Sequence, residues 1–182
     1  MNDLLYNKKT AYVTLFLMVL ISIFIIGGND IRREQQRILD VMNGYNELGI
    51  NVVDESEIIL ANSSNLLVVA SRYVSTSGRR LVEMRQFGDP NAEEWENNFS
   101  RVDEFMPDVH QLINELGALD IENRSAAQLT EIVINIDAAS RRIRLSGYND
   151  AAHNFNRVLR NPYTGTIAAV RGISSFRTVG EW

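Results

Sequence analysis

Few side chains in this sequence could carry out chemistry. The chain has no cysteine, which excludes disulfides, iron–sulfur clusters and a thiolate nucleophile. Its two histidines are His110 and His153. Asp150 and His153 form the best local pair, but neither histidine has a second histidine or carboxylate four residues on, as a helical metal pair needs. We interpret both histidines as ordinary surface or hydrogen-bonded residues, and we expect no metal site and no cofactor.

Motif searches give no sign of an enzyme. The sequence contains no phosphate-binding loop, no G-x-S-x-G, no H-E-x-x-H and no kinase signature. Neighbouring carboxylates such as Glu93 and Glu94 lie in an acidic stretch, with no apolar surroundings that would raise a pKa. We expect no catalytic residue, and we predict that the protein is not an enzyme.

Arginines form a basic segment late in the chain. Arg124–Trp182 carries eight arginines and four acidic residues, whereas Asp89–Glu122 is strongly acidic. The net charge of −5 argues against nucleic-acid binding. Three explanations of the arginines remain open: a solvated face, pairing with the acidic segment, or contact with anionic lipid; we favour the pairing. The residues concerned are Arg141, Arg142, Arg144, Arg157 and Arg160.

Two aromatic–asparagine pairs follow in the same region. Tyr148-Asn149 and Phe155-Asn156 are seven residues apart, so two helical turns put both on one face. This face could bind a partner. Alternatively, the aromatic rings fill a core while the asparagine side chains bridge to a neighbouring helix, because a buried amide needs hydrogen-bond partners. We favour the second interpretation.

A long apolar run near the N-terminus predicts a membrane anchor. Residues 11–28, after a short tail of residues 1–10, contain no charged side chain. About 20 helical residues span the roughly 30 Å of bilayer hydrocarbon. A cleaved signal peptide should have a shorter apolar region and a small-x-small cleavage site, which Ile25–Asn29 does not provide. Lysines and arginines near the two ends are almost equal in number, so the orientation stays open.

Helical spacing dominates the remaining sequence. Residues 95–116 place apolar side chains at alternating steps of four and three, typical of a helix that packs along a seam. Pro107 within this segment predicts a kink or a break near Met106. Ser125-Ala-Ala-Gln128 resembles a capping box that opens the last helix, and Asn161-Pro162 ends it. The seam residues are Trp95, Phe99, Val102, Met106, Val109, Ile113 and Leu116.

These patterns predict an all-α protein. Its transmembrane helix is followed by an antiparallel bundle of three to four long helices. The bundle is expected over residues 29–161. Residues 162–182 are expected to form a mostly irregular tail with an apolar patch at Ile167–Val170.

The stretch Arg144–Pro162 resembles the last helix of LemA-family proteins. That helix carries a Tyr-Asn pair and a second aromatic–Asn pair seven residues on, here Tyr148-Asn149 and Phe155-Asn156. Tyr45-Asn46 after the apolar run fits the same layout. The family's Asp-Leu-Ile-Pro-Asn-Leu stretch is not intact here; only Asn65-Leu66 echoes it. The resemblance implies a divergent bacterial member, with a helical bundle on a membrane anchor, placed on the cytoplasmic side.

Two functions of different classes fit these observations. The first is a non-enzymatic scaffold or protein-interaction module, anchored in the lipid bilayer through residues 11–28, with a protein partner or a second copy of itself. The alternative is an extracytoplasmic ligand-binding sensor domain of a membrane protein, which would require a pocket between helices. The candidate interaction face comprises Tyr148, Asn149, Phe155, Asn156, Arg141, Arg142 and Arg144.

Overall fold

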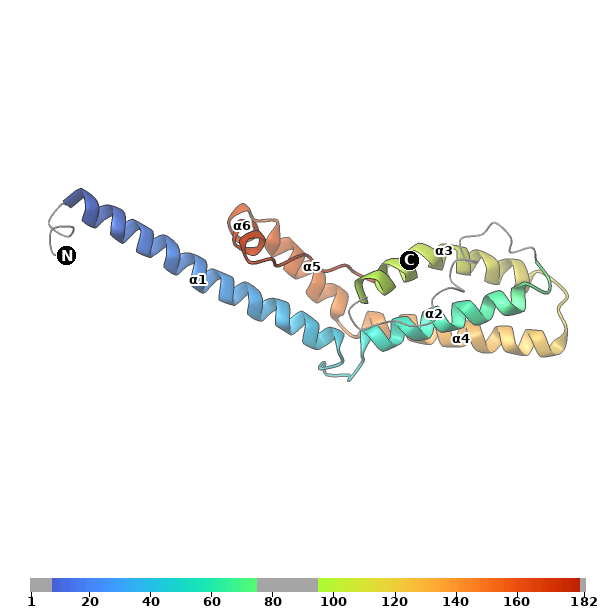
Figure 1. The fold of residues 1–182 in the computed structure, drawn as a ribbon. Helices are drawn as coiled ribbons and strands as arrows, with labels where there is room; N and C mark the ends of the chain where they lie inside the picture. The colour runs from blue at the N-terminus through green and yellow to red at the C-terminus, as the bar shows by residue number, and fades with distance from the viewer. Residues whose placement is uncertain (1–7, 75–94, 181–182) are drawn as a thin grey trace. The chain divides into compact units, whose positions relative to one another are not determined.

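The computed structural model describes residues 8–74 and 95–180 (Figure 1). These residues form six helices and no strand, which confirms the all-α fold. The chain divides into two compact units. Unit 1 combines Met1–Ile38 with Asn154–Phe176, and unit 2 combines Leu39–His153 with Arg177–Trp182. The helices are α1 (Lys8–Met42), α2 (Val52–Ala70), α3 (Trp95–Gly117), α4 (Asn123–Leu145), α5 (Tyr148–Leu159) and α6 (Pro162–Val170).

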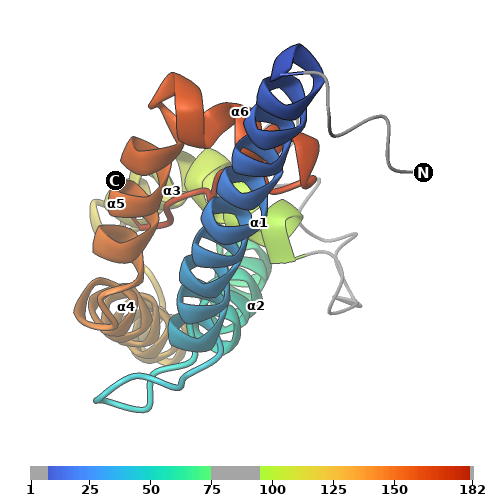
Figure 2. The same cartoon turned by 90° about the vertical axis from the view of Figure 1, so that its left-hand side faces the viewer.

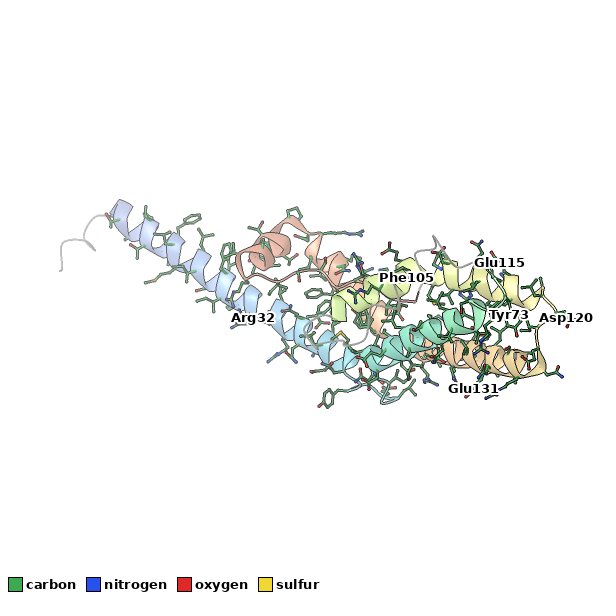
Figure 3. All side chains as sticks on the ribbon, turned by 45° about the vertical axis from the view of Figure 1, so that its right-hand side comes forward. Arg32, Tyr73, Phe105, Glu115, Asp120 and Glu131 are labelled. Carbon is green, nitrogen blue, oxygen red and sulfur yellow. The ribbon has the colours of Figure 1, made fainter. Side chains whose placement is uncertain are left out.

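Helix α1 is one unbroken helix of 35 residues. Its most apolar window has a mean hydropathy of 2.4 and is only 6% buried, so α1 is long and apolar enough to cross a membrane. Large apolar side chains such as Phe16 and Ile26 are exposed on it, and Figure 3 shows side chains projecting from the ribbon along its length. The helix continues beyond the predicted span 11–28 to Met42, and the later turns bury Ile31, Ile38 and Met42.

A tight loop of residues 43–51 connects α1 to α2. Gly44 and Gly49 adopt φ angles of +90° and +65°, which favour glycine. Asn46 Nδ2 donates to the carbonyls of Val41 and Ile50, and its Oδ1 accepts from the amides of Leu48 and Ile50. A single amide side chain therefore holds both arms of the loop together.

Within unit 2, α2 packs against both α4 and α3. Figures 1 and 2 show α2 and α4 side by side, and Figure 1 shows α4 running antiparallel to α2 and α3. Asn51 starts α2, because its side chain accepts from the amides of Val53 and Asp54. The core is filled by large side chains that are almost fully buried, among them Ile59, Leu66, Leu67, Phe99, Met106, Leu112, Leu116 and Ile136.

Helix α3 buries the predicted seam but differs at its proline. Pro107 lies inside the helix, which continues through it to Gly117, so the helix does not break there. Met106 and Val109 are buried on either side of the proline. Packing of these side chains offsets the roughly 3 kcal/mol that a proline costs inside a helix. Phe99, Val102 and Leu116 are also buried, whereas the side chain of Trp95 lies outside the described residues.

The last predicted helix is two helices. Gly147, with φ +76°, separates α4 from α5, and Ser146 Oγ accepts from the amide of Tyr148. The predicted capping box is wrong: α4 already begins at Asn123, and Ser125 is buried, with no hydrogen-bond partner for its hydroxyl among the described residues. The N-cap residue of α4 is Glu122 and not Ser125, so the helix begins three residues earlier than the sequence predicted.

The C-terminal region is more ordered than the expected irregular tail. Asn161 caps α6 by accepting from the amide of Tyr163, and Pro162 occupies the first turn. Gly172, with φ +66°, then turns the chain into an extended segment. We call residues 173–180 the C-terminal strap. From Ile173 on, every third residue of the strap is apolar and buried: Ile173, Phe176 and Val179.

Candidate interaction site

The two aromatic residues of the candidate face are core residues. Tyr148 is 0% exposed and Phe155 is 2% exposed. In unit 2 the Tyr148 ring meets the ring of Phe99 edge to face, with centroids 5.6 Å apart. In unit 1 the Phe155 ring meets Phe176 in the same manner at 5.5 Å. Such pairs contribute about 0.5–1.5 kcal/mol beyond the burial of their area. These rings therefore stabilise the fold.

The two asparagines bind the main chain of the strap. In unit 1, Asn156 Nδ2 donates to the carbonyl of Phe176 at 2.6 Å, and Asn156 Oδ1 accepts from the amide of Phe176 at 2.9 Å. In unit 2, Asn149 does the same to Val179, at 2.7 and 3.1 Å. We call each of these bidentate contacts an asparagine clamp. The asparagines thus contact the strap, and not a neighbouring helix as the sequence suggested.

The seven-residue spacing of the pairs has a geometric reason. Seven residues of α-helix rise about 10.5 Å. The clamped strap residues, Phe176 and Val179, are three apart, and three extended residues cover about 9–10 Å. Asparagines two turns apart on α5 therefore match every third residue of an extended chain. The same period of three explains why the apolar side chains of Ile173, Phe176 and Val179 are all buried.

Two further contacts hold the strap in unit 2. The hydroxyl of Tyr148 donates to the carbonyl of Arg177 at 2.7 Å, and Asp103 Oδ1 accepts from the amide of Gly180 at 3.1 Å. The candidate face of α5 is thus covered by the chain's own C-terminal segment. A protein partner could reach these residues only by displacing the strap.

Arg142, a residue of the candidate face, forms an ion pair with another helix. Its Nε donates to Glu55 Oε1 at 2.6 Å, and this hydrogen bond raises the pKa of Arg142 above its ordinary value. Glu55 Oε2 is buried without a hydrogen-bond partner among the described residues, so Arg142 is the charge that compensates this carboxylate. Glu55 belongs to α2, so the predicted pairing of Arg142 with the acidic α3 is wrong; α2 is the neighbour against which α4 packs.

A second polar contact fixes the register of α2 and α4. Asn135 Nδ2 donates to Asn62 Oδ1 at 3.4 Å. This contact lies seven residues from the Arg142–Glu55 pair on both helices, in opposite order along the chain. Equivalent positions of an antiparallel coiled coil repeat at this interval.

The other four arginines named in the sequence analysis and both histidines lie at the surface. Arg141 and Arg144 are exposed on α4, and Arg157 and Arg160 are exposed around the end of α5. His110 and His153 are exposed on α3 and α5. No cluster of three or more histidine, aspartate or glutamate side chains that could hold a metal occurs within residues 8–74 and 95–180. Glu93 and Glu94 lie outside the described residues.

Sequence reasoning missed Arg171 and the structural role of Asn46. In unit 1, Arg171 donates to the carbonyls of Phe24 and Ile25 and to the side chain of Asn29. A lone arginine that follows an uncharged helix gives no sequence signal for such a contact. Asn46, by contrast, had a signal: it follows a tyrosine and stands between Gly44 and Gly49, and asparagine and glycine are typical turn residues.

Comparison of the chain with protein-family models, with curated proteins and with solved structures gives no match in any of the three. Support for a function therefore comes from the geometry of the chain itself.

Proposed function

We propose that this protein is a single-pass membrane protein, a divergent relative of the LemA family, whose helical bundle is a non-enzymatic scaffold or protein-interaction module beside the membrane. The observation that carries the proposal is the surface of α1. Most side chains from Tyr12 to Ile26 are large, apolar and exposed, including Phe16 at 63% and Ile26 at 63%. Exposed apolar surface of this extent is stable in hydrocarbon and costly in water.

The packing of unit 2 favours a scaffold over a ligand sensor. Large aliphatic and aromatic side chains fill the space between α2, α3 and α4. The outer face of α4 instead presents Ile134, Arg141 and Leu145, of which Ile134 and Leu145 are each 59% exposed. Exposed apolar residues beside an arginine are typical of protein-binding surfaces. A second copy of this chain or another protein could dock there.

The distribution of arginines supports a cytoplasmic bundle. Arg32, Arg33 and Arg37 follow the apolar part of α1. The contact of Arg171 with Phe24 and Ile25 adds a fourth arginine at this end of the apolar run. Basic residues close to a span favour the cytoplasmic side. This agrees with the orientation that the LemA resemblance implies.

Site-specific photo-crosslinking of the full-length protein in native membranes tests the scaffold function. A photoreactive residue at position 141 should give one discrete adduct, either with a second copy or with one other protein. The matched control is position 124, an exposed arginine in the first turn of the same helix. Adducts of equal yield at both positions, or none at position 141, would overturn the proposed function.

A further inference from the structure

Unit 1 contains an apolar groove between α1 and α6. Its cavity volume is about 440 Å³, and it is lined by Met18, Val19, Ser22, Ile23, Ile26 and Gly27 of α1 together with Tyr163 of α6. Ligand sites in proteins have volumes of roughly 300–1,000 Å³. The groove is therefore large enough for a small molecule, and its walls limit that molecule to an apolar one.

Two glycines of α1 allow α6 to approach closely. A Cβ atom at Gly27 would lie 3.1 Å from Cδ1 of Ile167, and a Cβ atom at Gly28 would lie 2.4 Å from Nε of Arg171. Because Gly28 has no side chain, the guanidinium reaches the carbonyls of Phe24 and Ile25. Arg171 is thereby held at the end of the apolar run of α1, and Figures 1 and 2 both show α6 beside α1.

The position of the groove along α1 matches one leaflet of a bilayer. From Gly27 back to Met18 the helix rises about 13–14 Å, which is close to half of the roughly 30 Å of hydrocarbon. Arg171 marks the headgroup end of this interval, where an arginine can meet water and phosphate. Every lining residue of α1 belongs to the span, so the groove opens where acyl chains surround the helix.

We propose that the groove between α1 and α6 is a lipid-binding site that holds one acyl chain of a phospholipid, with α6 lying in the hydrocarbon of the leaflet on the side of Arg171. Helix α6 suits this environment because it has no charged residue and its exposed side chains include Tyr163 and Val170. Arg171, which follows its C-terminal end, limits its depth. The proposal rests on the proposed membrane anchoring of α1.

The depth of α6 can be measured because the chain has no cysteine. The full-length protein, with one nitroxide-labelled cysteine, is reconstituted in vesicles of phosphatidylcholine and phosphatidylglycerol. Leu17→Cys is the reference within the span, and Ile134→Cys is the reference on the bundle; both residues are exposed. At Tyr163→Cys we expect greater collision with oxygen than with a water-soluble nickel chelate, as at Leu17→Cys.

The outcomes separate the two proposals. If Tyr163→Cys behaves like Ile134→Cys while Leu17→Cys stays in lipid, α6 is in water and the groove proposal fails, whereas the anchor stands. If Leu17→Cys is itself accessible to the nickel chelate, anchoring fails and the groove proposal fails with it.

The occupant is tested with a phospholipid that carries a diazirine in its acyl chain. Light should attach this lipid to the peptide that contains Tyr163. Ser22→Trp fills the groove and should lower this labelling several-fold. Ile21→Trp is the matched control, because Ile21 does not line the groove. Labelling that Ser22→Trp leaves unchanged, or that both variants lower equally, would overturn the acyl-chain site.

Discussion

At the scale of single residues, asparagine is the amino acid that organises this chain. Asn46 closes the loop between α1 and α2, Asn51 and Asn161 cap helices, and Asn149 and Asn156 hold the strap. Asparagine suits all three tasks because its amide both donates and accepts, and because it carries no charge whose burial would be costly. The amide groups of Asn149 and Asn156 can therefore bind both the carbonyl and the amide of one strap residue.

Loss of one clamp should release the strap. Asn156→Ala removes two hydrogen bonds to Phe176, and each hydrogen bond contributes about 0.5–1.5 kcal/mol net, so the unfolding free energy should fall by about 1–3 kcal/mol. Thermal unfolding of the full chain in detergent measures this change, and limited proteolysis should cut the strap sooner.

Asn154→Ala is the control for this prediction, because Asn154 is exposed on the same helix and bonds only to Arg157 in the contacts described. Equal proteolysis rates for the two variants would contradict the clamp.

Glu57 should make the stability dependent on pH. Burial and, secondarily, the charge of Asp54 raise its pKa above the ordinary value of 4.5. The folded chain then binds the proton more tightly than the unfolded chain. This contribution is complete below pH 4.5 and is lost as the pH rises through the raised pKa of Glu57. Glu57→Gln should therefore be more stable than the wild type at neutral pH.

Denaturation midpoints of the wild type and of Glu57→Gln, measured from about pH 4 to pH 8, test this expectation, because a carboxyl group with a raised pKa titrates within about this range. The higher stability of Glu57→Gln relative to the wild type should disappear at the acid end of this range. Glu131→Gln serves as the control, since Glu131 is exposed on α4, as Figure 3 shows. A gain of the same size in the control would show that net charge, and not Glu57, is responsible.

At the scale of helices, glycines decide where one element ends and the next begins. Gly147 separates α4 from α5 with a φ of +76°, and a Cβ atom there would meet nothing within 4 Å. Gly117, at the end of α3, also has open space around it, but its φ is not positive. The two positions therefore differ in backbone conformation and not in packing.

The same substitution at these two glycines should have opposite effects. Gly147→Ala forces an alanine into the left-handed region and should cost about 1–2 kcal/mol. Gly117→Ala should be neutral or should stabilise the chain by up to about 1 kcal/mol, because alanine is the better helix former. Thermal unfolding monitored by circular dichroism measures both. A loss of stability at Gly117 similar to that at Gly147 would contradict the argument.

Much of the helical architecture could be predicted from the sequence, because the spacing of apolar residues depends on the helical period alone. The seam residues Phe99, Val102 and Met106 were predicted in this way, and they are buried. The break after α4 was not predicted, since Gly147 reveals its φ only in the folded chain. The strap could not be predicted. Its binding depends on side chains of α5 that contact distant backbone groups, and backbone groups have no sequence signature.

At the scale of the whole molecule, α1 is long and apolar enough to cross a membrane. The apolar run and its continuation to Met42 form one helix, Lys8–Met42. The proposed function and the proposed lipid site both depend on insertion of this run. Its insertion can be tested independently of any partner.

Two arginines within the span should prevent stable insertion. Val19→Arg together with Ile21→Arg should raise the insertion free energy by about 6 kcal/mol on translocon-based scales. Carbonate washing of membranes should then extract the double variant but not the wild type. The matched control, Val19→Leu with Ile21→Leu, should stay in the membrane. Retention of the double arginine variant would show that this segment does not anchor the chain.

The asparagine clamps also have a consequence for how this protein can diverge. The asparagine side chains bind main-chain amides and carbonyls of the strap, which every amino acid except proline provides. The strap residues between the buried ones can therefore change in evolution; they include Ser174, Ser175 and Thr178. Insertions and deletions are different. One residue more or fewer between Phe176 and Val179 would break the match with two helical turns of α5. Relatives of this protein should therefore vary in the amino acids of this segment but not in its length.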